Sequence, residues 1–169
     1  MSLNNSYVYI SGPYRGSSTH DSAGYAEISQ NILNARLVAM KLARVGIPYF
    51  CPHLNSAHFE LYTPEVPSSY WLNLDLILLR HSSACLVLPR WKESEGAKIE
   101  VDECHRLTIP VFASVDKLQL FWNEVAGGEE SSPLSEEDPR QREHQLNLFS
   151  HLDEQEEFHS SGLHSVSFH

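Results

Sequence analysis

At 169 residues, of which 41% are hydrophobic, the chain is long enough for one globular domain with its own core. It has no run of about 18 apolar residues, and no basic stretch followed by an apolar one at its start. The sequence therefore predicts neither a membrane-spanning helix nor a secretory signal. A formal net charge of −10 argues against general binding of nucleic acid.

The acidic charge is concentrated in the C-terminal part of the chain. Ten acidic and two basic residues give residues 127–169 a net charge of −8, which leaves −2 for residues 1–126. The composition also changes there to Glu, Ser, Gln and His, so we expect an α/β domain over 1–126 and an acidic, disordered tail over 127–169. A weak helix over 140–158 is predicted within the tail. The five histidines of the tail lack the spacing of metal ligands, so no metal site is expected.

The predicted elements alternate between strands and helices. A strand at 7–11 leads through a polar segment to a helix over 23–45, in which apolar residues recur at spacings of three and four. Gly46 ends this helix. The short apolar run 47–51 is a second strand, stopped by Pro52.

The middle of the chain continues this alternation. Residues 53–67 read as an irregular loop, and a helix then begins with Ser68 or Ser69 as its N-cap. The apolar run 84–88 is typical of a central strand buried on both faces, and 89–93 is the loop after it.

The last part of the domain holds a helix over 94–106, a strand over 109–113 and a closing helix over 116–125. Strands that alternate with helices imply βαβ units with right-handed crossovers. We therefore predict an α/β fold: a flavodoxin- or Rossmann-like three-layer sandwich with a mainly parallel sheet of four to five strands.

Three cysteines, Cys51, Cys85 and Cys104, stand at unrelated spacings among apolar residues. An odd number at such spacings is more typical of buried free thiols in a reducing cytoplasm than of a disulfide or a metal site. We therefore expect unpaired thiols and a cytoplasmic location.

The first predicted strand ends in a small-residue turn, Gly12-Pro13-Tyr14-Arg15-Gly16. Open α/β sheets bind ligands beyond the carboxyl ends of their strands, where backbone N–H groups are exposed. Arg15 adds a planar cation suited to phosphate or carboxylate. The turn therefore predicts a site for a small anionic group.

A second segment, Ser94-x-Gly96-x-x-x-Glu100, follows the most apolar strand. Gly96 and Glu100 are four apart, so they share one helix face near the N-terminus, where free N–H groups favour an anion. A glutamate in this place can act as a nucleophile at an electrophilic sugar carbon. For the pattern taken alone, a surface glutamate on an amphipathic helix is the commoner explanation.

Three further residues are candidates, each with a structural alternative. Asp75 lies among apolar residues, a setting that is unfavourable for an acid unless it is paired or functional, although it can also be the polar edge of a helix. Tyr9 shares a strand face with Ser11 and can simply belong to the core. His53 follows the second strand at the ligand-binding edge, where a lone histidine is more often structural. These separate segments are expected to converge on one crevice, which favours a site.

Three segments resemble the nucleoside 2-deoxyribosyltransferase superfamily: the run Tyr9-Ile10-Ser11-Gly12-Pro13-Tyr14-Arg15-Gly16, the helix with Asp75, and Ser94-x-Gly96-x-x-x-Glu100. Within it, the turn with Arg15 and Gly16 is most similar to the 2′-deoxynucleoside 5′-phosphate N-hydrolases and to related uncharacterised phage and bacterial proteins. The resemblance covers about residues 7–114 and leaves out the tail.

The resemblance implies a role for each matching residue. Glu100 matches the nucleophile that attacks the anomeric carbon, Tyr9 the tyrosine that orients it, and Asp75 the acid that contacts the sugar or assists departure of the base. The residues expected to bind substrate are Gly12, Arg15, Gly16, His53, Ser94 and Gly96. The resemblance requires no metal or organic cofactor and implies a small deoxynucleoside or deoxynucleotide as partner, with no nucleic acid and no membrane. It also implies a homodimer or higher homo-oligomer.

The expected function is cleavage or transfer of the N-glycosidic bond of a 2′-deoxynucleoside or its 5′-monophosphate, with Arg15 favouring the monophosphate and hydrolysis. The alternative is a non-catalytic nucleotide-binding or sensing protein on the same scaffold. A cytokinin-activating type of phosphoribohydrolase is disfavoured because its P-G-G-x-G-T-x-x-E loop is absent. A flavodoxin-like electron carrier is disfavoured because no Ser/Thr-rich phosphate loop follows the first strand in the usual form.

Overall fold

A single sheet of four parallel strands organises the part of the chain that the computed structural model describes, residues 6–16 and 22–126. The strands are β1 (Val8–Ser11), β2 (Tyr49–Phe50), β3 (Ala84–Val87) and β4 (Val111–Phe112). They lie in the order β2-β1-β3-β4, and every neighbouring pair is parallel. The predicted α/β architecture is therefore confirmed, with four strands.

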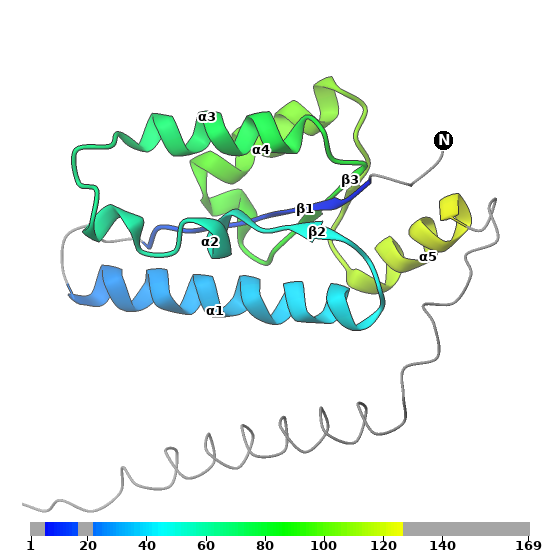
Figure 1. Ribbon diagram of the computed structural model, residues 1–169, viewed down its shortest axis with the longest axis horizontal. Coiled ribbons are helices and arrows are strands. Elements are labelled where there is room, and N and C mark those ends of the chain that lie inside the picture. The colour runs from blue at the N-terminus through cyan, green and yellow to red at the C-terminus, as the bar shows by residue number, and fades with distance from the viewer. Residues whose placement is uncertain (1–5, 17–21, 127–169) are drawn as a thin grey trace, which may run out of the picture. The chain divides into compact units, whose positions relative to one another are not determined.

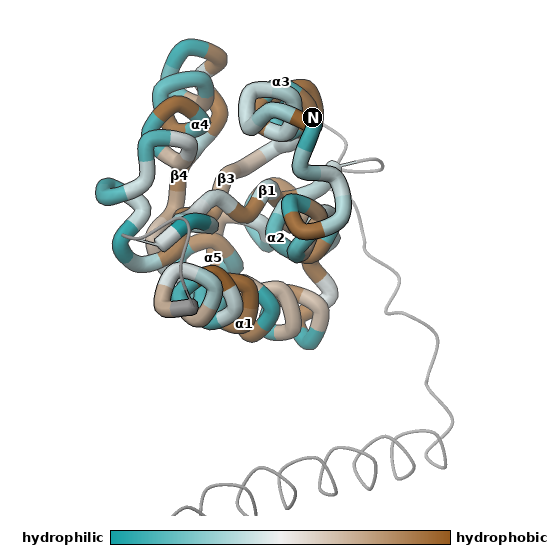
Figure 2. Tube along the Cα trace, turned by 90° about the vertical axis from the view of Figure 1, so that its left-hand side faces the viewer, coloured by the Kyte–Doolittle hydropathy of each residue, from teal (hydrophilic) through white to brown (hydrophobic). Residues whose placement is uncertain are grey.

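Helices cover both faces of this sheet (Figures 1 and 2). One layer holds α1 (Ser22–Arg44) and α5 (Val115–Ala126), and the opposite layer holds α3 (Ser68–Leu79) and α4 (Glu95–Arg106). Figure 2 shows the strands between these two layers, as expected for a three-layer sandwich. Within the described part of the chain, no helix combines the length and apolar character needed to cross a membrane.

The core is divided between the two faces of the sheet. Val8 and Ile10 belong to the buried cluster that includes residues of α1 and α5, whereas Tyr9 belongs to the cluster with residues of α3 and α4. Because successive side chains of a strand point to opposite faces, Ser11 faces the same layer as Tyr9. Both β1 and β3 are buried along their whole length, which confirms the prediction of a central strand at 84–88.

The segment predicted as a loop over 53–67 contains regular structure. A short helix, α2 (Pro52–Asn55), begins there with Pro52 in its first turn, where the missing N–H of proline does no harm. A 3-10 turn, η1 (Phe59–Leu61), follows it. A second 3-10 turn, η2 (Trp91–Glu93), lies within the loop predicted at 89–93.

The predicted N-cap of α3 is wrong. Pro67, in an extended conformation, is the N-cap residue, and it makes no side-chain cap. Ser68 is instead the first helical residue, and its hydroxyl accepts a hydrogen bond from Arg15. By contrast, Ser94 caps α4 as the sequence suggests, because its Oγ accepts a bond of 3.3 Å from the backbone N–H of Ala97.

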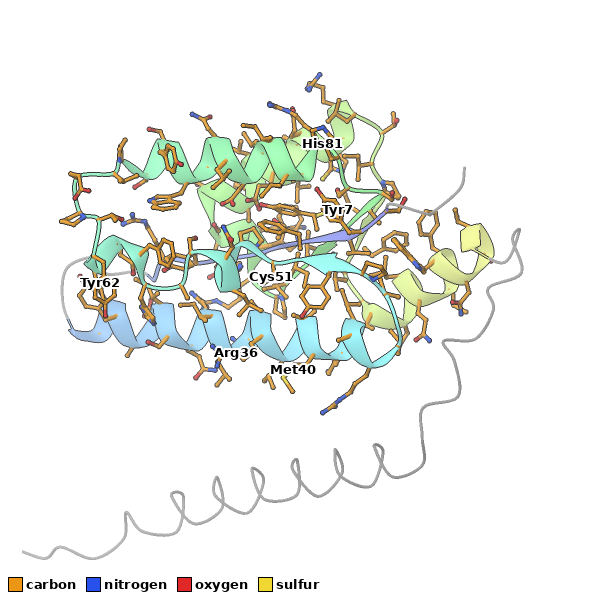
Figure 3. The ribbon with its side chains drawn as sticks, in the orientation of Figure 1. Tyr7, Arg36, Met40, Cys51, Tyr62 and His81 are labelled. Carbon is orange, nitrogen blue, oxygen red and sulfur yellow. The ribbon has the colours of Figure 1, made fainter. Side chains whose placement is uncertain are left out.

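All three cysteines are buried and free, as predicted. Cys51 lies in the interior between α1 and the sheet (Figure 3). The tail at 127–169 and the weak helix predicted at 140–158 lie outside the described residues.

The strand order defines where a ligand site is expected. The chain passes from β1 to β2 on one side of β1, and β3 then pairs on its other side. The region beyond the carboxyl ends of β1 and β3 is therefore the switch point of the sheet, the usual ligand position in this architecture. The loop after β1 and the start of α3 lie together toward the left in Figure 1. In Figure 3, Tyr7 lies near the opposite, amino end of β1.

Candidate active site

Glu100 is a buried carboxylate held by two hydroxyl groups from one strand. Its side chain is only 7% exposed. The hydroxyl of Tyr9 donates a hydrogen bond of 2.7 Å to Oε1, and Oγ of Ser11 donates one of 2.6 Å to Oε2. Each carboxylate oxygen therefore has its own donor.

Local structure explains why these three side chains meet. Tyr9 and Ser11 are two residues apart on β1, so both point toward the layer of α3 and α4. On α4, the buried positions Ala97, Glu100, Val101 and Cys104 recur at spacings of three and four and form the face turned to the sheet. Glu100 therefore occupies a core position of the helix, which excludes the surface glutamate considered above.

Burial and hydrogen bonding shift the pKa of the Glu100 carboxyl in opposite directions. Burial raises the pKa of its carboxyl above the ordinary value, because the ion loses its water. The hydrogen bonds from Ser11 and Tyr9 favour the charged form and oppose that rise. Burial and the adjacent carboxylates likewise raise the pKa of Tyr9 well above its ordinary value, so its hydroxyl remains a donor at neutral pH.

Asp75 is the second carboxyl of the site and comes from α3. It is half-buried, and burial together with the charge of Glu100 raises its pKa to about 7. Asp75 also contributes to the high pKa of Tyr9, so all three groups share one electrostatic environment. The described residues donate no hydrogen bond to Asp75, whereas Glu100 accepts two. The hydrogen bonds to Glu100 therefore favour its charged form, whereas burial and the charge of Glu100 favour the protonated form of Asp75.

An ion-pair network joins the two helices that carry these carboxyls. Arg80, at the end of α3, donates from Nε to Oε1 of Glu103 on α4 over 2.6 Å. Arg106 donates to both oxygens of the same carboxylate, over 2.7 and 2.8 Å. These hydrogen bonds lower the pKa of Glu103 to about 2. The network lies one turn beyond Glu100 and ties the position of α4 to that of α3.

The start of the turn after β1 is held by contacts with Leu88 and His53. Gly12 packs so closely against Leu88 that an added Cβ would lie 2.7 Å from the leucine side chain. Nε2 of His53 lies 3.0 Å from the carbonyl oxygen of Pro13, to which it donates. Burial lowers the pKa of His53, so the ring is neutral and acts here as a support for the turn. Its Nδ1 is buried and has no partner among the described residues.

Tyr14 and Arg15 extend the turn toward the η1 segment and α3. The hydroxyl of Tyr14 donates to Oε2 of Glu60 over 2.8 Å and accepts from the backbone N–H of His58 over 2.9 Å. Arg15 is exposed and donates from Nη2 to Oγ of Ser68 over 2.9 Å. Gly16 packs against the side chain of Glu27, which an added Cβ would overlap.

Gly96 differs from the other two glycines of the predicted site. A Cβ built at Gly96 would have Ser94 Oγ as its nearest neighbour, 3.9 Å away. Gly96 therefore leaves open space on α4, one turn before Glu100 and on the same helix face. This space is suited to a ligand that approaches the start of the helix.

The structure thus joins Tyr9, Asp75 and Glu100 in one cluster, and it places the remaining predicted residues around it. Ser94 caps α4 and Gly96 leaves space, whereas Gly12, Gly16 and His53 shape the turn. Arg15 contacts the first residue of α3 rather than a residue of the carboxyl cluster.

Ser11 is the one member of this cluster missing from the predicted site residues. The available signal was its spacing: a serine two residues after Tyr9 lies on the same strand face and meets the same helix.

A separate shallow hollow lies between the end of α1 and the start of α5. Its lining residues are Lys41, Arg44, Val45, Ser114, Val115, Asp116 and Gln119. No predicted site residue is among them, so the hollow is not part of the candidate site.

No model of a known protein family matches the chain, and a search of curated proteins found no significant relative. The geometry of the site and the sequence motifs are therefore the grounds for assigning a function.

Proposed function

We propose that the protein cleaves the N-glycosidic bond of a 2′-deoxynucleoside or its 5′-monophosphate, with Glu100 as the nucleophile. The observation that carries the proposal is the buried Glu100 carboxylate, held on both oxygens by hydroxyl groups and acting through its charge on Asp75, whose pKa is raised to about 7. Two carboxyls whose surroundings separate their protonation states are suited to paired nucleophile and acid roles. The motifs shared with nucleoside 2-deoxyribosyltransferases agree with this assignment.

In the first step, an oxygen of Glu100 attacks C1′ of the deoxyribose. The bond from C1′ to the base nitrogen breaks, its electron pair goes to the base, and the base takes the proton of Asp75. The product is a glycosyl ester of Glu100 together with free base. Tyr9 holds the attacking carboxylate in place throughout.

In the second step, an acceptor attacks C1′ and releases the Glu100 carboxylate. Asp75, ionised after the first step, takes the proton of the acceptor and returns to its starting state. Water as acceptor gives hydrolysis, and a second base gives transfer. We expect the 5′ group of the substrate to bind between the turn with Arg15 and the start of α4, where Gly96 leaves free space.

The test is release of free base from each of the four common 2′-deoxynucleosides and their 5′-monophosphates, followed by chromatography. We expect release from at least one of them and a loss of about 1,000-fold or more in Glu100→Gln, because the nucleophile is removed. Glu124→Gln, an exposed glutamate on α5, is the matched control and should retain full activity.

A trapping experiment identifies the reaction class independently. A 2-fluoro-2-deoxyribosyl nucleoside should leave a covalent adduct on the protein, and peptide mass spectrometry should place it on Glu100. Base release that persists in Glu100→Gln would contradict the proposal. Tight nucleotide binding with no release and no adduct would instead favour the non-catalytic alternative.

A further inference from the structure

Ser11 occupies a position that packing alone does not explain. Its side chain is fully buried at the end of β1, whose preceding residues Val8, Tyr9 and Ile10 all belong to the hydrophobic core. A buried hydroxyl is unfavourable unless it makes a hydrogen bond, and Ser11 makes its bond, of 2.6 Å, to Oε2 of Glu100. The serine is therefore matched to the carboxylate rather than to the core.

Two donors on separate oxygens have a geometric consequence for Glu100. With Tyr9 as its single donor, the carboxylate could swing through a range of angles about its last side-chain bond while Oε1 stayed within hydrogen-bond reach of the hydroxyl. The bond from Ser11 to Oε2 removes this freedom, because both oxygens are now tied to one rigid strand. The free lone pairs of the carboxylate then keep a constant direction.

The titratable groups around Glu100 make the second hydrogen-bond donor important for the ionisation of its carboxyl. The titratable groups that act on or near it are Tyr9 of β1, Asp75 of α3, Cys85 of β3 and Cys104 of its own helix. None of these is a cation, and no cation forms an ion pair with Glu100 within residues 6–16 and 22–126. Lys98, the nearest basic residue along the helix, pairs with Glu95 at 2.6 Å. Within the described residues, the hydroxyl groups of Tyr9 and Ser11 are therefore the groups that stabilise a negative charge on Glu100.

We propose that Ser11 is a second positioning residue for Glu100, which fixes the rotation of the carboxylate and favours its ionised form. The effect on catalysis rests on the proposed function, whereas the effect on ionisation does not. In the proposed reaction, the hydroxyl aligns the attacking oxygen in the first step. In the second step it stabilises the carboxylate as that group leaves.

The ionisation is tested by a titration of the glutamate carboxyl carbons by NMR in ¹³C-labelled protein, with the Glu100 signal assigned by its loss in Glu100→Gln. Ser11→Ala should move the Glu100 titration to higher pH. The matched control is Ser82→Ala, which removes another buried serine hydroxyl, one that donates to the carbonyl oxygen of Leu79 over 2.7 Å. The Glu100 titration should be unchanged in this control.

Two conservative variants separate hydrogen bonding from packing. Ser11→Cys keeps the size of the side chain but supplies only a weak donor, so it should resemble Ser11→Ala. Ser11→Thr keeps the hydroxyl and should resemble the unsubstituted protein. Two results would contradict the positioning role of Ser11. One is a Glu100 titration in Ser11→Cys with the same midpoint as in the unsubstituted protein. The other is an unchanged midpoint in Ser11→Ala.

The kinetic readout distinguishes this proposal from the proposed function. Ser11→Ala should lower kcat for base release about 10- to 100-fold with little change in KM, and should move the acidic limb of the pH profile to higher pH. Absence of base release in the unsubstituted protein would contradict the proposed function but leave the NMR result to decide on Ser11. If Ser11→Ala has a normal kcat but a shifted Glu100 titration, Ser11 affects the ionisation of Glu100 and the proposed effect on catalysis is contradicted.

Discussion

Tyr9 and Glu100 lie 91 positions apart in the sequence, yet the tyrosine hydroxyl is 2.7 Å from Oε1 of the glutamate. Both groups are buried, and the bond crosses from the central strand β1 to the helix α4. A bond from a neutral hydroxyl to a buried charge is worth about 1.5 to 3 kcal/mol, more than a bond between neutral groups. This contact therefore links the fold to the reactivity of the carboxylate.

The first prediction concerns the tyrosine hydroxyl. Tyr9→Phe keeps the ring in the core but removes the donor, so we expect kcat to fall about 10- to 100-fold with little change in KM. Steady-state kinetics on the best substrate would measure this. Tyr25→Phe, on the exposed part of α1, should be as active as the unsubstituted protein. Full activity of Tyr9→Phe would show that the hydroxyl does not act on the nucleophile.

The second prediction contrasts two glycines. A Cβ at Gly96 would have Ser94 Oγ as its nearest neighbour, 3.9 Å away, so Gly96→Leu should stay folded, with stability equal or greater by up to about 1 kcal/mol. Base release should fall more than about 100-fold, because the leucine fills the space beside Glu100. Circular dichroism with urea titration, combined with the release assay, would measure both effects.

Gly12→Ala supplies the opposite control. Its Cβ would lie 2.7 Å from Leu88, so we expect a loss of about 1 to 3 kcal/mol in the free energy of unfolding. If Gly96→Leu keeps its activity, substrate does not use the space at Gly96. If Gly12→Ala is as stable as the unsubstituted protein, the turn adapts more readily than its packing suggests.

Much of the fold was predictable because its signals are local. The apolar run at 84–88 and the spacing of apolar residues over 23–45 each specify one element, and the structure confirms both in β3 and α1. Residues 53–67 were less predictable, since short helices depend on contacts with the rest of the chain. Tyr14 shows this dependence, because its hydroxyl binds Glu60 and the backbone of His58.

The site was predictable only in part for a related reason. Asp75 stands out in the sequence because an acid among apolar residues needs an explanation, whereas Tyr9 and Glu100 stand out through the motifs that contain them. Ser11 does not, because serine is common in turns and its partner lies 89 positions away. The hydrogen bond from Arg15 to Ser68 was also not predictable from the sequence. It depends on Pro67, and not Ser68, being the N-cap residue of α3, which leaves the Ser68 hydroxyl free to accept the bond.

The third prediction concerns the thiols. All three cysteines are buried, and burial raises the pKa of Cys51 to about 11. The hydrogen bond to Cys104, together with burial, raises the pKa of Cys85. The same hydrogen bond lowers the pKa of Cys104, but all three thiols are buried away from the reagent. A chromogenic disulfide reagent should therefore modify no cysteine in the native protein and all three in denaturant. Rapid reaction of the native protein would indicate local opening of the core.

The last prediction follows from Asp75, whose pKa is raised from 3.8 to about 7. A carboxyl whose folded-state pKa is raised binds its proton more tightly in the folded state than in the unfolded state. Its contribution to stability is therefore fully present below about pH 4 and is lost as the pH rises through about 7. Ionisation of Asp75 should also end its action as an acid, so base release should fall above about pH 7.

Asp75→Asn removes this proton equilibrium while keeping the shape of the side chain. We compare the free energy of unfolding of Asp75→Asn with that of the unsubstituted protein. This difference should rise in favour of the variant, by an amount on the order of 2 kcal/mol, between about pH 5 and about pH 8. Solvent at the half-buried carboxyl should make the measured rise smaller. Urea unfolding at the two pH values measures this difference, and Asp102→Asn, an exposed change on α4, should show no such rise. The alkaline limb of the release profile should vanish in Asp75→Asn together with most of the activity. A stability difference that is the same at both pH values would mean that Asp75 is ionised throughout, and the proton for the leaving base would then have to come from another group.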